Sequence, residues 1–406
     1  MIHSSFFRPR AFPVNTDAAP NEIDRLQDMA ATTNLKREKV YEIGRDDIVD
    51  WKQSIPDVSV SLKQMEYGSL DFYNILANKA SSNTLLTLND FKTSITDIAG
   101  YSTDDNGTFL STIWYPKLRV SGFDLSIGDP DAFVERSFNL MGEDEIIWSD
   151  NNKYLIYLTS TATGVNHQIV IGSGGFSTYP VPVADPDSSG TVYIQRVVRY
   201  RGTTTTELVL TTDYTYNSGT ATLTIPSSAA SDVYKVWYTA ASYITGVEPF
   251  VENDSDLASI SADSVSIYLN TSNYVYRLQN VGINVSLSRQ DVKEIGNFNI
   301  VQRGITDKTV KITLGRFLES YTLEQILRGA LTTTYGKYDV RRYADNISLV
   351  VKVYSDRNKG TFKLGYKFEN LSPTTTDAGI PIRDYVKKGA TLEGSDCTIT
   401  NVEASL

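Results

Sequence analysis

The stretch that decides the fold is Leu35-Lys-Arg-Glu-Lys-Val-Tyr-Glu-Ile-Gly44, because it returns 252 residues later as Leu287-Ser-Arg-Gln-Asp-Val-Lys-Glu-Ile-Gly296. Leu, Arg, Val, Glu, Ile and Gly are identical in the two stretches. The same offset places Val58-Ser-Val-Ser-Leu62 on Val310-Lys-Ile-Thr-Leu314, and both alternate as half-buried strands do. A shared offset of this kind indicates an internal duplication.

Further matches carry the offset along the chain. Phe133–Asp144 aligns with Tyr385–Asp396, and the amphipathic stretch Leu70–Leu76 aligns with Leu323–Leu327 within one residue. Asn106-Gly-Thr-Phe109 matches Lys359-Gly-Thr-Phe362 one residue out of step, and Asn-Gly predicts a tight hairpin in the first copy. The pattern predicts two copies of a module of about 120 residues, ordered strand, strand, short helix, further strands. The alternative is two unrelated β segments that share common residue types.

The segment between the copies differs in character. It is rich in Ser, Thr, Tyr, Val and Gly, and about six or seven short alternating runs are separated by turn signals. This predicts an antiparallel, immunoglobulin-like sandwich held by packing alone. The predicted fold is mainly β: two curved-sheet modules, each with a short helix, and an inserted sandwich. The predicted divisions are an N-terminal extension (1–26), a first module (27–149), the sandwich (150–245), a linker and return strand (246–278) and a second module (279–406).

Composition excludes several classes of protein. The 406 residues are 41% hydrophobic, enough for real cores, and 48 acidic against 38 basic residues give a net charge of -10. A basic nucleic-acid-binding surface is therefore not expected. One cysteine and two histidines exclude an intrachain disulfide and a His-rich metal site. The N-terminus lacks the pattern of a signal peptide, and no apolar run is long enough to cross a bilayer.

Candidate sites of chemistry are weak. Gly172-Ser-Gly-Gly175 lacks the lysine of a phosphate-binding loop, and Asp185-Pro-Asp-Ser-Ser-Gly190 lacks the distal glutamate of a calcium loop. His167 has no nucleophile motif, and Cys397 is expected to be a small buried hydrophobe. No pair stands out among the acidic residues. We expect no enzymatic activity, no catalytic residue, no cofactor and no metal.

We expect the residues that align between the two copies to have a structural role. Gly44 and Gly296 follow alternating strands, which fits a bulge or a sheet corner. The predicted structural residues are Val40, Glu42, Ile43, Gly44, Val58, Leu62, Val292, Glu294, Ile295, Gly296, Val310 and Leu314.

A family resemblance rests on three of these stretches. Ala31–Arg45, followed by Pro56–Leu62 and Gly68–Leu76, resembles the start of bacteriophage tail tube proteins, also called major tail proteins. The resemblance covers both copies, about two thirds of the chain, and has no invariant signature. The duplication and the inserted sandwich depart from the minimal family. The resemblance implies a virion structural protein, with a stay in the host cytoplasm during assembly.

The resemblance also implies partners. Tube subunits join their sheets, about four strands per module, into one barrel whose closure removes sticky edges. Two modules per chain predict a homotrimeric ring with pseudo-sixfold symmetry, with a homohexamer as the alternative. Rings would stack into a tube in contact with other tail proteins and with a tape measure protein. Genomic DNA would pass through without specific binding, which suits an acidic lumen. The sandwich is predicted to project outward.

Two other functions are compatible with the sequence. The first is a surface or decoration protein that binds host glycan or capsid through the sandwich, with its tyrosine-rich strands supplying aromatic contacts. The second is a tail-associated polysaccharide hydrolase, which requires an essential carboxylate pair.

Overall fold

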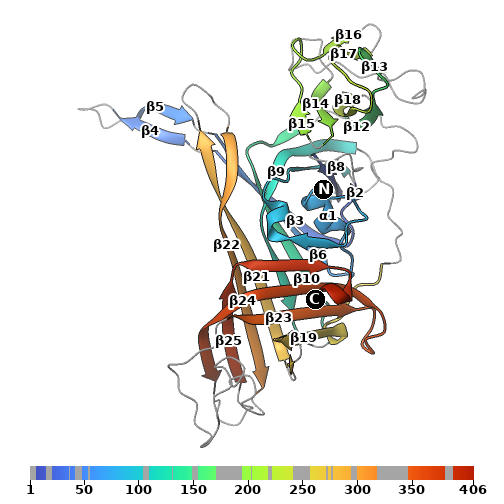
Figure 1. Ribbon diagram of the computed structural model, residues 1–406. Coiled ribbons are helices and arrows are strands. Elements are labelled where there is room, and N and C mark those ends of the chain that lie inside the picture. Colours follow the sequence, from blue (N-terminus) through green and yellow to red (C-terminus); the bar gives the residue numbers. More distant parts are fainter. Residues whose placement is uncertain are drawn as a thin grey trace, which may run out of the picture. The chain divides into compact units, whose positions relative to one another are not determined.

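The computed structural model describes residues 6–14, 21–35, 37–41, 48–53, 55–103, 109–129, 131–148, 154–170, 194–202, 204–217, 222–240, 257–270, 273–275, 278–293, 300–317, 346–379 and 387–406. These residues are mostly antiparallel strands (Figure 1), which confirms the predicted mainly β class. In this part of the chain, no helix has the length and apolar character needed to span a membrane.

The chain divides into two compact units. Unit 1 comprises Met1–Ile23, Ile95–Leu118 and Asp144–Asp254, and unit 2 comprises Asp24–Ser94, Arg119–Glu143 and Ser255–Leu406. This division by contacts differs from the one read from the sequence. The sheet strands that repeat lie together in unit 2, whereas residues 95–118 of the first copy group with the inserted segment.

Unit 1 begins with a five-stranded antiparallel sheet. β1 (Phe6–Pro13) pairs with β2 (Asn21–Glu22) and with β8 (Thr96–Thr103). β8 then pairs with the first part of β9 (Phe109–Ile127), which pairs in turn with β11 (Ile146–Trp148). The segment predicted as an N-terminal extension therefore supplies a full strand to this sheet.

The inserted segment forms two antiparallel sheets around one core. The first has the order β12 (Tyr154–Thr161), β18 (Val233–Ala240), β14 (Ile194–Arg201), β15 (Thr204–Glu207), and the second has the order β13 (His167–Val170), β17 (Thr222–Ile225), β16 (Thr215–Asn217). Both sheets contribute to the core, including Ile169, Val197, Leu223, Tyr234 and Val236. Facing sheets of this kind make a sandwich. Its immunoglobulin-like topology stays a prediction, since residues 171–193 lie outside the described residues.

A buried ion pair ties the sandwich to the N-terminal sheet. Arg196 of β14 donates from Nη1 to both carboxylate oxygens of Asp97 of β8, at 3.0 and 2.9 Å. Asp97 is fully buried and also accepts from the backbone N–H of Lys117 at 2.8 Å. Beside the pair, Trp114 of β9 and Trp237 of β18 belong to one shared apolar cluster. The sandwich is therefore part of the core of unit 1 rather than an appendage.

A carboxylate within the sandwich, Asp232, gives its stability a pH dependence. Arg201 donates to Asp232 from Nε and Nη2 at 2.8 and 2.6 Å, and these bonds lower the pKa of Asp232 to about 2. The folded pKa lies below the unfolded value, so the stabilisation is present above about pH 4 and is lost as the pH falls towards 2. We expect Asp232→Asn to melt at a lower temperature than the wild type at pH 7. We also expect its melting temperature to fall less than that of the wild type when the pH is lowered. Melting curves by circular dichroism at several pH values test this; an equal acid-induced drop in both proteins would contradict it.

Unit 2 is built on two antiparallel sheets that share one long strand. The larger has the order β3 (Leu26–Asn34), β6 (Asp57–Met65), β10 (Glu135–Gly142), the second part of β9, β21 (Leu278–Lys293), β22 (Ile300–Phe317), β25 (Lys387–Gly394) and the end of β24 (Phe362–Gly379). The smaller has the order β20 (Asn273–Tyr274), β19 (Val265–Leu269), β23 (Ile347–Tyr354), the start of β24, β26 (Asp396–Thr400) and β7 (Leu85–Thr87). The ribbon β4 (Arg37–Tyr41) and β5 (Ile48–Gln53) pairs separately.

The helical elements are short. α1 (Asp71–Leu76) falls on the stretch predicted to be amphipathic and buries Phe72, Tyr73 and Leu76. The rings of Phe72 and Tyr73 pack edge-on against Phe138 of β10, with centroids 4.9 and 5.0 Å away. The 3-10 turns are η1 (Leu88–Phe91), η3 (Ala262–Ser264) and η4 (Glu403–Ser405). The second-copy counterpart at Leu323–Leu327 and the predicted turn at Asn106-Gly107 lie outside the described residues.

The strand pairing of the larger sheet carries the same repeat as the sequence. Its halves are β3-β6-β10-β9 and β21-β22-β25-β24 (Figure 1), four strands in each. Adding 252 to the pair Met29↔Leu62 gives Val281↔Leu314, and every β3–β6 pair has such a counterpart. β9 maps on β24 with an offset of 253, so that Phe109 and Phe362 begin the two strands. The match of Asn106–Phe109 with Lys359–Phe362, which is one residue out of step in the sequence, thus reflects the offset of 253 between β9 and β24.

Candidate functional site: the polar face of the eight-stranded sheet

The larger sheet of unit 2 has one buried and one polar face. In β6, Val58, Val60 and Leu62 are buried, whereas the residues between them are exposed or half-exposed. The same alternation runs through β10, β21 and β22. We call the second side the polar face. Its uncharged members are Ala30, Thr32, Asn34, Ser59, Ser61, Met65, Ser126, Ser137, Asn139, Met141, Gly282, Asn284, Ser286, Thr309, Thr313 and Thr391.

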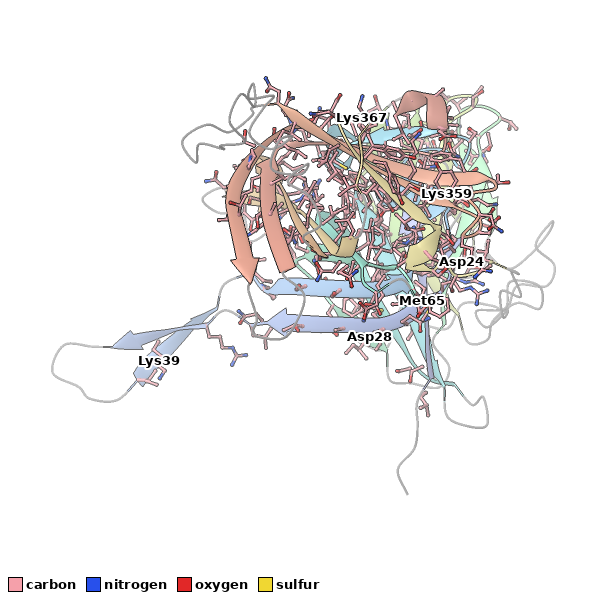
Figure 2. The ribbon with its side chains drawn as sticks, turned by 90° about the horizontal axis from the view of Figure 1, so that it is seen from below. Asp24, Asp28, Lys39, Met65, Lys359 and Lys367 are labelled. Atoms are coloured by element: carbon pink, nitrogen blue, oxygen red, sulfur yellow. The ribbon has the colours of Figure 1, made fainter. Side chains whose placement is uncertain are left out.

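The charged members of the polar face are mainly acidic. The described side chains include five carboxylates, two ammonium groups and one guanidinium: Asp28, Asp57, Asp124, Glu135 and Glu393, with Lys63, Lys311 and Arg119. Asp28 of β3 and Met65 of β6 are labelled in Figure 2. Lys63 and Glu135 form an exposed ion pair at 2.9 Å, which neutralises charge but adds little stability. Among its described side chains, the face combines small polar groups with a net negative charge, which disfavours contact with phosphate.

The two halves of the sheet join where β9 pairs with β21, from Gly122↔Ser286 to Ile127↔Val281. On the buried side, Phe123 lies opposite Val285 in this register. On the polar face, Asn284 donates a side-chain hydrogen bond to Asp124. We call this pairing the internal junction.

Close backbone approach at the internal junction requires glycine at one position. A Cβ on Gly122 would lie 2.5 Å from the carbonyl oxygen of Val285, which is too close for any side chain. A Cβ on Gly282, in the facing strand, would meet nothing within 4 Å. The two glycines therefore offer a matched pair for substitution.

Beneath the sheet, Arg136 of β10 is fully buried beside Glu66. Its Nη1 donates to the Glu66 carboxylate at 3.2 Å, and its Nε donates to Gln64 at 3.1 Å. Glu66 also accepts from the backbone N–H of Gly68 at 2.7 Å. Burial acts to lower the pKa of Arg136, but the Glu66 carboxylate and nearby phenols outweigh it and raise the pKa overall. The guanidinium remains a cation in the core.

Two phenols extend this cluster across the repeat. Tyr366 of β24 donates to Glu66 at 2.9 Å, and its hydroxyl lies 3.0 Å from that of Tyr73 on α1. Burial raises the pKa of both tyrosines, so both stay protonated. Helix α1 of the first copy is thereby hydrogen-bonded to strand β24 of the second copy.

A half-buried cation lies at one end of the internal junction. Arg289 of β21 donates to the carbonyl oxygens of Phe91 and Val120, at 2.7 and 2.8 Å. Burial, together with the nearby positive charge of Arg119, lowers the pKa of Arg289 to about 10. Its hydrogen bonds go to backbone carbonyl oxygens, so we assign Arg289 a structural role.

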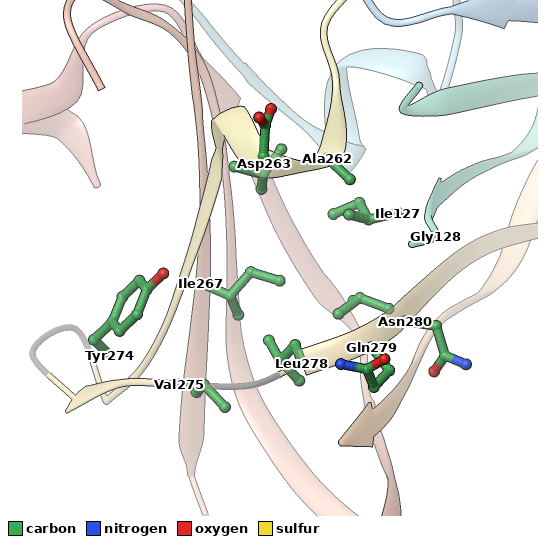
Figure 3. Close-up of a pocket in the computed structure, with 12 residues that line it drawn as sticks. Ile127, Gly128, Ala262, Asp263, Ile267, Tyr274, Val275, Leu278, Gln279 and Asn280 are labelled. Carbon is green, nitrogen blue, oxygen red and sulfur yellow. The ribbon is translucent and has the colours of Figure 1, made fainter. Parts of the chain in front are cut away.

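A pocket of about 160 Å³ lies at the other end of the internal junction (Figure 3). Its lining includes the apolar side chains of Ile127, Ile267 and Leu278 and the polar residues Asp263 and Gln279. Asp263 already accepts hydrogen bonds from the hydroxyls of Ser261 and Ser264. Among the described residues, no three or more His, Cys, Asp or Glu side chains are grouped to hold a metal ion.

The isolated residues considered for chemistry have ordinary structural surroundings. His167 is within hydrogen-bond distance of the Ser160 hydroxyl, at 2.9 Å, and stacks on Tyr234; burial lowers its pKa. Cys397 is buried in β26, and burial raises the pKa of its thiol. Gly172–Gly175 and Asp185–Gly190 lie outside the described residues.

The predicted structural residues fall into three groups. Val58 and Leu62 in β6, and Val310 and Leu314 in β22, are buried at equivalent positions of the two halves. Val40 lies in β4, while Val292 of β21 is 49% exposed. Glu42, Ile43, Gly44, Glu294, Ile295 and Gly296 lie outside the described residues, and their predicted role at a sheet corner stays a prediction.

A binding role for the sandwich would require tyrosines on its surface. The described ones mostly face inward: Tyr200, Tyr214, Tyr234 and Tyr238 are at most 7% exposed. Their role is packing, so they do not favour the decoration-protein alternative.

Two parts of the site were missed from the sequence. The acidic residues of the polar face could not be singled out, because strand order decides which carboxylates share a face. Arg136 and Glu66 are 70 positions apart, and only the pairing of β6 with β10 brings them together. The charged residue at an inward position of the alternating run Glu135–Gly142 was the available signal for Arg136.

No family model and no curated protein matches the chain. Among solved structures, the chain is similar to one from a "Cryo-EM structure of the anti-feeding prophage (AFP) baseplate, 6-fold symmetrised". The identity is 15%, the match covers 35% of this chain and 92% of that chain, and the TM-score is 0.26.

Proposed function

We propose that this chain is a ring-forming structural protein of a bacteriophage tail tube, whose polar face lines a conduit for DNA. The observation that carries the proposal is the internal junction. Two four-stranded halves of one chain already pair edge to edge in the way that repeated subunits of a barrel would. The chain then acts as two subunits in one, and closing the barrel removes its remaining edges.

Three chains would make a ring of suitable size. Roughly 24 strands, at about 4.8 Å spacing and about 40° tilt, give a backbone circle about 48 Å across. Small side chains on the polar face leave the lumen open, and its carboxylates keep phosphate groups from adhering. Stacked rings, contacts with other tail proteins and a tape measure protein, and the absence of enzymatic activity belong to the same proposal.

Negative-stain microscopy of the purified protein tests the proposal. We expect rings or tubes whose class averages have threefold symmetry and six similar lobes around the lumen. Particles that remain monomeric at all concentrations would contradict ring formation, and rings with sixfold symmetry and twelve modules would contradict the trimer.

The charge of the polar face gives a further prediction. We expect tubes of the double variant Asp28→Lys, Glu393→Lys to retain short duplex DNA at low salt and to release it at high salt, because Lys contacts with phosphate are salt-dependent. The matched control is Glu369→Lys, Asp396→Lys, which makes the same charge change on the smaller sheet. Fluorescence anisotropy of labelled duplex measures retention, and equal binding by both variants would contradict a DNA-facing role.

A further inference from the structure

The outer strands of the eight-stranded sheet are β3 and the end of β24. Within the described part of the chain, β3 is paired with β6, and residues 372–379 of β24 are paired with β25. No other described strand pairs with either segment. The run Met29-Ala-Ala-Thr-Thr-Asn34 has no charge and no proline, the usual means of blocking strand addition. In the described part of the chain, no strand therefore covers the outer side of either segment. The β24 segment does contain Pro373 and Asp377, but Pro373 lies before the run Thr375–Gly379.

The internal junction indicates which strand each outer strand would pair with. It joins β9, the last strand of the first half, to β21, the first strand of the second half. β24 is the counterpart of β9, and β3 is the counterpart of β21, because their partners within each half have matching registers. The open edges are thus the two sides of one more junction, and they lie at opposite ends of the same sheet.

We infer that β24 of one copy pairs antiparallel with β3 of the next copy in the register of the internal junction; this rests on the proposed function. The offsets of 253 for β24 and 252 for β3 convert each internal pair into an intermolecular one. Gly122↔Ser286 becomes Thr375↔Asn34, and Phe123↔Val285 becomes Thr376↔Thr33. Three more pairs follow: Asp377↔Thr32, Ala378↔Ala31 and Gly379↔Ala30. The counterpart of the sixth internal pair, Ile127↔Val281, would join Met29 to residue 380, which lies outside the described residues.

The two kinds of junction differ in chemistry. The internal junction has Phe123 opposite Val285 and Leu125 opposite Ile283, large apolar pairs suited to a permanent core. The corresponding intermolecular pairs are Thr376 with Thr33 and Ala378 with Ala31, which are small or polar. Less apolar surface is exposed on the free chain, and the intermolecular junction depends more on backbone hydrogen bonds. The partner that fits is a second copy of this chain.

Disulfide trapping in assembled rings tests the register. Asn34 and Thr375 are exposed and form the first intermolecular pair. We expect the double variant Asn34→Cys, Thr375→Cys to oxidise within rings to covalent dimers and trimers on a non-reducing gel, because paired strands bring Cα atoms within about 6 Å. The matched control, Ala30→Cys with Thr375→Cys, uses the same strands and face but is four residues out of register. It is expected to stay monomeric; Cys397 is common to both.

The outcomes separate the register from the function. Rings in which the in-register pair stays monomeric, or in which the control cross-links equally, overturn the inferred register and leave ring formation standing. Wild-type protein that forms no rings overturns both. If the cysteines themselves prevent assembly, hydrogen exchange on wild-type rings decides. Peptides covering 29–34 and 375–379 should become protected on assembly, and unchanged exchange in both would overturn the inference.

Discussion

Replacing Arg136 with methionine is expected to lower the free energy of unfolding of unit 2 by about 3–5 kcal/mol. Arg136 is fully buried, and its removal leaves the Glu66 carboxylate in the core without its cation. Glu66 keeps the hydrogen bonds from Gly68 and Tyr366, but these do not replace the lost positive charge. The double variant Arg136→Met, Glu66→Gln should recover part of the loss, because no charge then remains buried.

Hydrogen exchange in increasing urea, followed on peptides of β6 and β10, measures this effect within unit 2. The control is Lys63→Met, which breaks the exposed ion pair with Glu135 on the other side of the same sheet. That change is expected to cost at most about 1 kcal/mol. If Arg136→Met costs no more than Lys63→Met, the buried pair does not stabilise the core as described.

The second large effect is expected at the internal junction. Gly122→Ala places a methyl group 2.5 Å from the Val285 carbonyl oxygen, so β9 and β21 must move apart. We expect a cost of about 3 kcal/mol, the upper part of the range for overpacked sites. Hydrogen exchange of residues 281–286 should rise more than that of β6, because the damage is centred on the junction.

Gly282→Ala is the control for that substitution, because it adds the same methyl group to the facing strand in open space. Its effect is expected to stay within about 1 kcal/mol, since alanine suits a strand at least as well as glycine does. Equal effects of the two substitutions would show that steric contact at Gly122 does not hold the halves at their spacing.

Local patterns in the sequence predicted local structure well. The alternation of Val58, Val60 and Leu62 predicts the buried side of β6, and the amphipathic run from Leu70 predicts α1. The repeat offset appears again in the strand registers, because equivalent residues occupy equivalent places in the sheet. These features depend on neighbours in sequence or on the comparison of two copies.

Features that depend on distant pairing were not predictable. The association of β1 with β8, 85 residues apart at the pair Phe12↔Asp97, has no local signal. The same holds for the contact of Arg196 with Asp97, which merges the inserted sandwich with residues 95–118. β9 is one continuous strand of which the first part belongs to unit 1 and the second to unit 2, so a division by sequence segments could not separate the units.

The internal junction also bears on how fast a ring could start to form. In the proposed ring, every second junction is made when the chain folds, with its two sides held at a high effective concentration by the covalent link. Because two modules are joined in one chain, half as many molecules must meet to form a ring. The rate of ring nucleation is therefore less sensitive to dilution. In the proposed assembly, a two-module chain therefore begins a ring at a lower concentration than a single-module chain does.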